Sequence, residues 1–460
     1  MTASKIIQLE FNELCPPLME RFIAAGELPN FKALRDQSHT YITDAEERNE
    51  TLEPWIQWIT VHTGLSFEEH GIFNLGDAHK MTVPSVWDML SAEEYKVWIC
   101  GSMNMKYEQP INGRVLPDAW SNQNTPSSPE LSTLCNFVRQ SVQEHSNDHA
   151  PMSLGDYVKV LGFLVSHGLS FATVKDIAAQ LSNELRGRDS WKRAVILDKL
   201  LWDVFAHYHR KDRPHYATFF SNSVAHFQHK FWRNMEPELF ELKPSDEEQR
   251  RYKNAILFAY KETDKLVGKA MKLADQDTSI VFASALSQQP YLAADGEGGK
   301  HFYRPKDFTQ FVAGVGLRGV REVAPVMSEE FHVYFESEKL AEAGLKDLLA
   351  LTVNGRPLMK ARREAAEVFA GCTIFSDIEQ GAVLDANGVS LGFFDLFYQA
   401  DSIKSGMHHP DGMLWVCGPS RQHSVSEEKL PLRSIAPAIL EHFGVALAPG
   451  MQSVGAPIKF

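Results

Sequence analysis

The sequence of 460 residues has few cysteines, no excess of positive charge and no long apolar run, and each of these absences excludes a class of protein. Its five cysteines are scattered, odd in number and without a CxxC pair, which argues against a disulfide framework and favours a reducing cytosol. Lys and Arg number 46 against 59 Asp and Glu, so the net charge is −13. A chain this acidic, without a concentrated basic patch, is not expected to bind nucleic acid.

The sequence also gives no sign of an export signal or a membrane span. Its N-terminus has one Lys before a short apolar run that Gln8 and Glu10 interrupt, so it lacks the length and cleavage site of a signal peptide. The most apolar internal window, 161–174, contains His167 and Gly168 and is shorter than the ~20 residues that cross a bilayer. We therefore expect a cytoplasmic protein with no membrane partner.

What the sequence does contain is an alternation of short apolar runs and amphipathic segments. Hydrophobic residues make up 44% and charged residues 23%, as in ordinary globular proteins. The runs predict strands at 5–9, 95–100, 216–220, 279–283 and 413–417, and helices at 17–25, 51–63, 83–90, 254–274 and 434–443. Strands that alternate with helices indicate an α/β fold with a mostly parallel sheet, whose ligands bind beyond the carboxyl ends of the strands.

Two segments break this alternation. Residues 127–210 are rich in helical patterns, and residues 320–403 mix short strands with a helix. We predict one α/β core formed by 1–126, 211–319 and 404–460, interrupted by a helical insertion and a small α+β insertion. Both insertions are expected to act as the cap that selects the substrate.

Several short motifs, taken in order, resemble those of one family. They are Leu28-Pro29-Asn30-Phe31 with Leu34, Trp58 with Thr63-Gly64-Leu65 and His70-Gly71-Ile72, Val86-Trp87-Asp88-Met89-Leu90, His229-Lys230-Phe231-Trp232, Asp264 with Val267-Gly268, and Ile435-Ala436-Pro437-Ala438-Ile439-Leu440 with Phe443-Gly444. Together they resemble the alkaline phosphatase superfamily, most closely its type I phosphodiesterase/nucleotide pyrophosphatase branch. The resemblance implies a mostly parallel central sheet flanked by helices, with two metal ions that activate a Thr or Ser at a helix N-terminus.

The position of the nucleophile departs from the family pattern. Thr51 precedes the helix that ends at Thr63-Gly64, and the resemblance implies that it is the nucleophile. The family spacing would place that residue at Pro54, so Thr51 lies one helical turn early. A helix N-cap is the alternative role for Thr51, and Glu53 is an alternative nucleophile or base.

The resemblance implies four metal ligands. Glu10 stands where the family has its first-strand Asp, although a carboxylate at a strand end can also cap the next helix. His229 matches the middle histidine, and His226 lies three residues earlier, where both can face one metal. His408 fits the H-x-x-DG motif before the last strand.

Other family ligands are missing. Ala225 replaces one Asp, and Ala285 and Leu286 replace the Asp and His that follow the fourth strand. We therefore expect one divalent metal ion, zinc or manganese, and no second metal site. Substrate-binding roles are expected for Asn12, Gln288, Gln289, His301 and Arg304, although the loop around His301 and Arg304 can equally be a solvated loop.

Three functions fit this pattern. The first is a hydrolase or transferase for a small anionic phosphate or sulfate ester, with a reduced or rebuilt metal site. The second is an inactive or metal-free relative that binds an anionic ligand or a partner protein in the old cleft. The third is metal-free ester chemistry with Thr51 and a His base.

Overall fold

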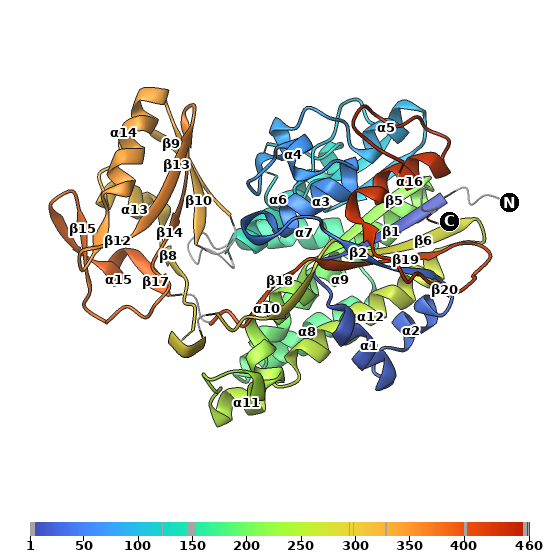
Figure 1. The fold of residues 1–460 in the computed structure, drawn as a ribbon, viewed down its shortest axis with the longest axis horizontal. Coiled ribbons are helices and arrows are strands. Elements are labelled where there is room, and N and C mark those ends of the chain that lie inside the picture. The colour runs from blue at the N-terminus through green and yellow to red at the C-terminus, as the bar shows by residue number, and fades with distance from the viewer. Residues whose placement is uncertain are drawn as a thin grey trace.

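A computed structural model describes residues 5–121, 123–144, 153–293, 295–297, 299–326, 329–399, 403–453, 458 and 460 of the chain. The molecule has a larger α/β part and a smaller α+β part, which lies to the left in Figure 1. No helix in the described residues has the length and apolar character that crossing a membrane requires.

The larger part is built on a sheet of nine strands within the described chain. The order is β20 (Ser424–Val425), β2 (His39–Asp44), β19 (Asp411–Cys417), β6 (Thr278–Ser284), β1 (Lys5–Phe11), β5 (Tyr216–Ser221), β3 (Val97–Cys100) and β4 (Gly113–Leu116), with β21 (Leu430–Pro431) beside β2. From β6 to β4 all neighbours are parallel, whereas β19 is antiparallel to both β6 and β2. The predicted α/β class with a mostly parallel sheet is confirmed.

Helices cover both faces of this sheet because its central strands are buried on both sides. Every residue of β5 and β6 is buried, and β1 is buried except at Lys5. The helices of this part are α1 (Pro16–Ala24), α2 (Pro29–Arg35), α3 (Pro54–Thr63), α4 (Phe67–His70), α5 (Val86–Ala92), α10 (Ser223–Met235), α11 (Asp246–Tyr252), α12 (Ala255–Leu273) and α16 (Ile435–His442). All of them except α4 contribute to, or pack against, one hydrophobic core shared with the sheet.

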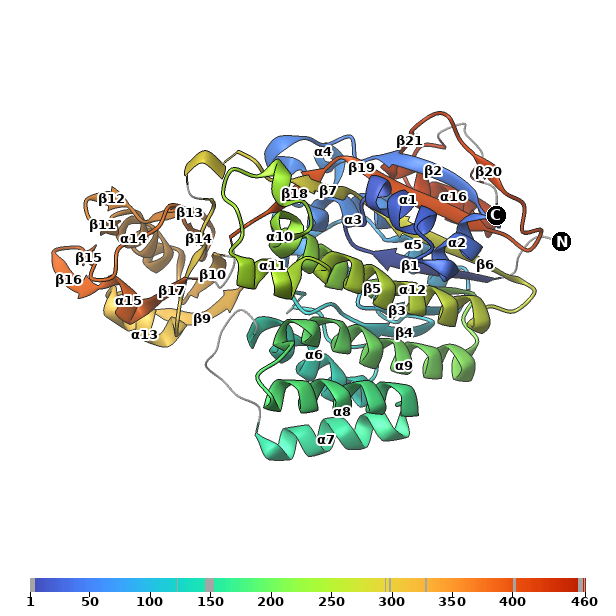
Figure 2. The ribbon, with the colours of Figure 1, turned by 90° about the horizontal axis from the view of Figure 1, so that it is seen from below.

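The helix-rich segment forms an outer layer on one face of the sheet. Its helices are α6 (Ser132–Glu144), α7 (Leu154–Ser166), α8 (Phe171–Leu185) and α9 (Ala194–Asp212). In α9, Phe205 packs against Trp98 of β3 and Phe219 of β5, so this segment belongs to the main core. Figure 2 shows α9, α8 and α7 successively farther from the sheet.

The smaller part has a hydrophobic core of its own, formed by residues from Tyr303 to Phe397. The sequence patterns predict that this part begins at residue 320, whereas its core already includes Tyr303. Its main sheet has the order β13 (Met359–Glu364), β14 (Glu367–Cys372), β10 (Glu330–Phe335) and β9 (Val320–Pro325), all antiparallel. The other elements are β8 (Tyr303–Pro305), α13 (Phe308–Gly314), α14 (Glu338–Leu349), β11 (Thr352–Val353), β12 (Arg356–Pro357), β15 (Val383–Ala386), β16 (Val389–Gly392), α15 (Phe393–Leu396) and β17 (Phe397–Gln399).

A two-stranded ribbon and a polar contact join the two parts. The ribbon pairs β7 (Ser287–Pro290) with β18 (Gly406–His409) and leads from the main sheet toward the smaller part in Figure 1. In the polar contact, His332 of β10 lies 2.5 Å from Glu367 and 3.3 Å from the carbonyl oxygen of Leu75. Lys80 lies 3.1 Å from Asp77 and 3.7 Å from Glu367. Its ammonium group supplies the positive charge between these carboxylates, so we interpret this group as an ion-paired contact.

The Asp264 carboxylate explains why two of the motifs occur together. It accepts hydrogen bonds from the backbone N–H groups of Asn30 and Phe31, at 2.9 and 2.7 Å, and from the Asn30 amide at 2.7 Å. These N–H groups lie in the first turn of α2, where no intrahelical acceptor is available. Gly268, one turn along α12, leaves room for Asn30, because a Cβ there would lie 2.5 Å from its side-chain oxygen.

We expect Asp264→Ala to lower the free energy of unfolding by about 2 kcal/mol, because it leaves charge-assisted hydrogen bonds of the α2 first turn unmade. Urea unfolding followed by circular dichroism measures the change. Glu342→Ala is the control, since Glu342 forms an exposed ion pair with Lys346 and should cost less than ~0.5 kcal/mol. Equal effects of the two variants would contradict this role of Asp264.

Candidate active site

Three ligand-capable side chains meet at the carboxyl edge of the parallel strands. Glu13 follows β1, His229 lies on α10 after β5, and His408 lies on β18, just before β19. One ligand atom from each of the three lies within 4.8 Å of the others. The register explains this, because Phe11 pairs with Ser221, so β1 and β5 end side by side.

Glu13 is the centre of this cluster. Its backbone has φ = 61°, a left-handed conformation that is uncommon outside glycine and is often found at functional sites. One carboxylate oxygen, Oε2, lies 3.0 Å from His229 Nε2 and 3.6 Å from His408 Nε2. Oε2 also accepts a hydrogen bond from Gln288, and Oε1 accepts one from Asn12 at 2.9 Å.

The charge state of Glu13 follows from these neighbours. Burial alone would raise the pKa of its carboxyl, but His408 and His229 and the hydrogen bonds from His229 and Gln288 outweigh burial and lower the pKa to about 2. Glu13 therefore carries a negative charge at neutral pH, although only 2% of its side chain is exposed. A buried charge of this kind needs a compensating partner.

The two histidines turn their Nε2 atoms toward that charge. His229 Nδ1 lies 3.0 Å from the Gly406 carbonyl oxygen, and His408 Nδ1 lies 2.9 Å from the Leu52 carbonyl oxygen. A carbonyl only accepts hydrogen bonds, so Nδ1 of each ring carries a proton, and a neutral His408 keeps its lone pair on Nε2. Burial lowers the pKa of His408 to about 3, despite the nearby charge of Glu13. At least at His408, a lone pair therefore faces a carboxylate, and a cation between them would satisfy both.

The donor set fits a divalent metal ion. Two His nitrogens and one carboxylate, with Nδ1–H groups fixed by backbone carbonyls, make up a three-ligand set typical of catalytic zinc sites with one open position. Gln288 supports this arrangement, because its Nε2 donates to Glu13 and, at 3.1 Å, to the Ala225 carbonyl. Its Oε1 is buried and has no hydrogen-bond partner within the described structure.

Glu53 lies beside this cluster at the start of α3. It is the N-cap residue of that helix, and its Oε2 lies 3.4 Å from His408 Nδ1. Burial raises the pKa of Glu53 to about 8; Lys404 opposes this rise, and Glu13, Glu330 and Glu329 add to it. Glu53 is therefore mostly protonated at neutral pH.

Positive charge reaches the site through the connection between the two parts. Lys404, just before β18, is the strongest positive influence on Glu53 and also acts on His408. Lys300 forms an isolated β-bridge with Lys404, which places two lysines on neighbouring backbones. Burial lowers the pKa of Lys300, and Lys404 lowers it further. This pair is a local cationic focus in a chain of net charge −13.

The predicted ligand Glu10 does not join the two histidines. It lies inside β1, where neighbours on both sides bury it completely. Its Oε1 is 2.9 Å from Gln8 and 3.0 Å from His62 of α3. Glu13 is the carboxylate that meets the histidines, because it lies past the end of the strand. The polar run at the end of β1 therefore predicted the position of the site, but the carboxylate within that run is Glu13 and not Glu10.

Two other predicted residues also lie outside the cluster. Thr51 ends a 3-10 helix (Asn49–Thr51), and its hydroxyl lies 2.9 Å from both Glu47 Oε2 and the Arg48 carbonyl oxygen. Because α3 begins at Pro54, the N-cap is Glu53, so the alternative role of Thr51 as an N-cap is wrong. His226 lies on α10 with His229 but is not part of the group of close ligand atoms in the described residues.

The predicted substrate-binding residues divide into two sets. Asn12 and Gln288 contact Glu13, and Gln289 donates to the His408 carbonyl oxygen at 3.3 Å. The other two belong to the region of the smaller part. His301 lies 2.6 Å from Gln399, and Arg304 is a buried residue of β8.

Buried apolar side chains occupy the positions where the family ligands are missing. Ala225, Ala285 and Leu286 are all buried in the main core or beside it, and none exposes more than 2% of its surface. In the described residues the other group of close ligand atoms is Asp77, His332 and Glu367, which Lys80 already neutralises in part.

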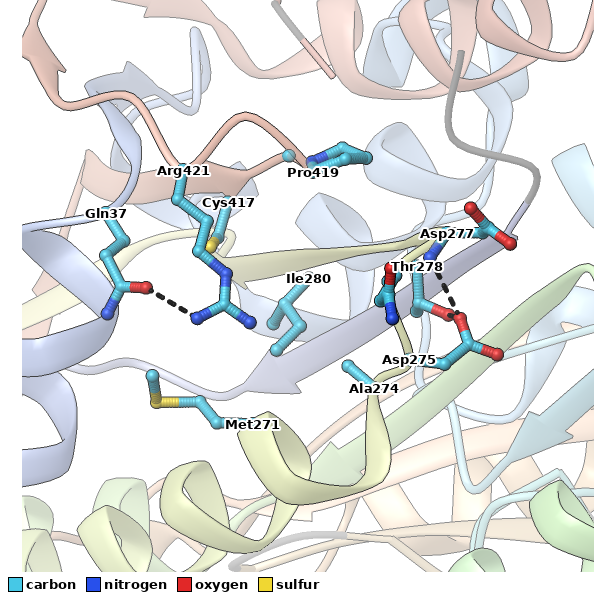
Figure 3. Close-up of a pocket in the computed structure, with 12 residues that line it drawn as sticks. Gln37, Met271, Ala274, Asp275, Asp277, Thr278, Ile280, Cys417, Pro419 and Arg421 are labelled. Atoms are coloured by element: carbon cyan, nitrogen blue, oxygen red, sulfur yellow. Dashed lines mark hydrogen bonds between the residues drawn. The ribbon is translucent and has the colours of Figure 1, made fainter. Parts of the chain in front are cut away.

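A cavity elsewhere in the sheet is not part of this site. Figure 3 shows a cavity of about 330 Å³ between the start of β6 at Thr278 and the end of β19 at Cys417. These are the opposite ends of the strands, about 20 Å from the Glu13 edge at ~3.3 Å per residue. Its lining includes Asp275 and Asp277, which disfavour an anionic ligand.

Comparison with known proteins points to one family. The family model described as type I phosphodiesterase / nucleotide pyrophosphatase matches residues 14–296, and no curated protein matches the sequence. Among solved structures, phosphonoacetate hydrolase from Sinorhizobium meliloti 1021 is 11% identical, with 96% of each chain covered and a TM-score of 0.45. Murine ectonucleotide pyrophosphatase/phosphodiesterase 5 is 9% identical (97% and 96% covered, TM-score 0.44), and the alkaline phosphatase PafA is 10% identical (100% and 98% covered, TM-score 0.49).

The raised pKa of Glu53 predicts how Glu53→Gln changes the stability of the metal-free protein. Folding favours the protonated carboxyl, so its contribution is fully present below pH 4.5 and is lost as the pH rises toward 8. The variant cannot ionise, and it should gain stability relative to the parent between pH 4.5 and 8, with no further gain above pH 8. Urea unfolding with a chelator present measures this, and a difference that does not change with pH would contradict it.

Proposed function

Because the chain belongs to the type I phosphodiesterase/nucleotide pyrophosphatase family, we propose that it hydrolyses a small anionic phosphoester with a single metal ion held by Glu13, His229 and His408. Zinc is the metal that best suits two imidazoles and a carboxylate. This assignment replaces Glu10 and His226 with Glu13 and keeps His229 and His408.

The observation that carries this proposal is that the lone pair of one histidine, His408, faces a negatively charged carboxylate. His408 presents an unprotonated Nε2 to the ionised Glu13 carboxylate at 3.6 Å. His229 stands at 3.0 Å from the same oxygen. Without a cation the His408 lone pair and the carboxylate repel each other, whereas a bound cation would convert the same atoms into ligands. A cation there polarises the phosphoryl oxygens of a bound ester.

The chain's own groups are suited to bind and orient an anionic ester. Lys404 and Lys300 supply positive charge beside the cluster. The amino end of α3, a helix of ten residues, adds its partial positive charge. The ester phosphate would therefore lie between α3 and the lysine pair, next to Glu13.

Glu53 is the group we assign to proton transfer. It holds a proton at neutral pH because its pKa is about 8, and 29% of its side chain is exposed, so a substrate can reach it. An acid with this pKa can protonate the departing alkoxide in the operating range of most enzymes. Thr51, the nucleophile implied by the family resemblance, is a weaker candidate since its hydroxyl lies against Glu47 and Arg48.

One observation favours a second function, an inactive relative that binds an anion. Ala225, Ala285 and Leu286 provide no ligand where the family holds its second metal, and a one-metal site has less charge to stabilise the transition state. In that case the metal and the lysine pair would bind a phosphate-bearing ligand without turnover. The experiments below separate the two functions.

Metal content tests the ligand assignment. We expect one zinc ion per chain after reconstitution and dialysis, because three ligands converge at one place. His229→Ala and His408→Ala should lose it, and His226→Ala, on the same helix as His229, should retain it. Inductively coupled plasma mass spectrometry gives the stoichiometry. Two ions per chain, or equal retention in all three variants, would refute the assignment.

Leaving-group dependence tests the role of Glu53. With zinc bound, Glu53→Gln should lower kcat by about 10²–10⁴ on a phenyl or alkyl phosphodiester, because general acid catalysis is lost. The loss should be smaller on a p-nitrophenyl diester, whose leaving group needs little protonation.

Thr51→Ala is the matched comparison for Glu53→Gln. It should keep kcat within a few fold of the parent if Thr51 is not the nucleophile. Loss of all turnover in Thr51→Ala with full activity in Glu53→Gln would reverse the two roles. Zinc binding without turnover of any diester or monoester by the parent protein would favour the inactive relative.

A further inference from the structure

The outer helices α7 and α8 expose an unusual amount of apolar surface. Nine of the fifteen exposed large hydrophobic side chains in the described residues lie on these two helices, with 43% to 91% of their surface exposed. They are Leu154, Tyr157, Val158, Leu161, Val165, Phe171, Val174, Leu181 and Leu185. The two helices are joined by the four residues 167–170 and lie at the outer edge of the molecule in Figure 2.

These side chains follow the spacing of a helix-packing seam. On α7 the apolar positions are 154, 158, 161 and 165, and on α8 they are 171, 174, 178, 181 and 185. The intervals alternate between three and four residues, as in the a and d positions of coiled coils and helix bundles. Such a seam inserts its side chains between those of a facing helix, so the pattern points to helices as partners.

The exposed seams are not the surfaces that attach the helices to the protein. On α7 the buried residues are Val160 and Leu164, and on α8 they are Thr173 and Gln180. Each helix therefore packs against the rest of the protein through a different side from its exposed seam. A second apolar side that faces solvent does not stabilise the single chain, and exposed apolar surface gathered on neighbouring elements marks interaction surfaces.

The size of the surface fits a stable dimer. The nine side chains together expose the equivalent of about six whole side chains, which at roughly 60–120 Å² for each Val or Leu side chain is about 400–700 Å² of apolar surface. Standard interfaces bury about 800 Å² per partner. Because about 60% of an interface is apolar, one copy of this surface supplies the apolar area that a symmetric dimer requires from each protomer.

Charge argues against a lipid surface as the partner. Residues 154–185 contain the cations Lys159 and Lys175 and the anions Asp156, Asp176 and Glu184, a net charge of −1. Membrane-surface helices are rich in Lys and Arg and bind anionic lipids. A protein of net charge −13 would be repelled by such lipids.

We propose that α7 and α8 form the interface of a homodimer, in which the helix pair of one protomer packs against the same pair of a second copy. A two-fold axis makes such a surface self-complementary, and two helix pairs complete a four-helix bundle. The dimer axis then lies at the outer helical layer, and the Glu13 site, at the carboxyl edge of the sheet, is independent of it.

Light scattering after size exclusion tests the dimer. At about 20 µM the protein should have about twice the chain mass of 51.9 kDa. Leu161→Glu and Leu181→Glu each introduce a charge into the seam and should raise the dimer dissociation constant at least 30-fold. Circular dichroism should show an unchanged fold, since both side chains are more than half exposed in the single chain.

Val389→Glu is the matched control, because Val389 is 56% exposed on β16 of the smaller part and should leave the mass unchanged. A monomeric parent protein at 20 µM would overturn the proposal. So would co-sedimentation of a monomer with phosphatidylglycerol vesicles that Leu161→Glu abolishes, or dissociation by Val389→Glu to the same extent as by the seam variants.

Discussion

The arrangement on which the site depends is a buried, ionised Glu13 carboxylate that faces Nε2 of His408, which lacks a proton, and Nε2 of His229. The Leu52 carbonyl on the far side of the His408 ring fixes the Nδ1 proton in place, so this imidazole cannot relieve the repulsion by changing tautomer. Burial holds the pKa of His408 far below neutrality, so a second proton does not relieve it either. A cation is the remaining solution, and the roles assigned to Glu53, Lys404 and Lys300 follow from placing one there.

The rest of the fold serves to hold these three side chains. The parallel register of β1 and β5 brings Glu13 and α10 to one edge, and the β7–β18 ribbon carries His408 to the same edge from the end of the chain. Gln288, opposite His408 in that ribbon, donates to Glu13. The same ribbon leads to the smaller part, so His408 and Lys404 lie on the connection between the two parts. The smaller part is therefore well placed to influence substrate binding.

Much of the fold could be predicted from the sequence, since apolar runs such as 216–220 and 279–283 are long enough to mark buried strands. The end of the helix at Gly64 was also predictable, because glycine is the residue that most easily ends a helix in the left-handed conformation, and Gly64 has φ = 67°. The site was predicted less completely. Strand periodicity indicates that the run from Glu10 to Glu13 ends a strand, but it does not indicate at which residue the backbone turns. A left-handed φ at Glu13 depends on tertiary contacts.

The sequence also did not determine which of the two histidines on α10 reaches Glu13, or which of Thr51 and Glu53 begins α3. His226 and His229 lie three residues apart, a spacing that permits a shared ligand but does not require one. Which of them reaches Glu13 depends on how α10 packs against β18, a contact between distant parts of the sequence. The start of α3 is fixed by Pro54, which suits the first turn of a helix, and this makes Glu53 the N-cap in place of Thr51.

The central claim is that one cation binds between Glu13, His229 and His408. X-ray diffraction from crystals of the zinc-loaded protein, collected on both sides of the zinc absorption edge, tests it most directly. The expected result is one anomalous peak per chain, about 2.0–2.2 Å from His229 Nε2, His408 Nε2 and a Glu13 oxygen. A peak at Asp77, His332 and Glu367 instead, or none at Glu13, would contradict the claim.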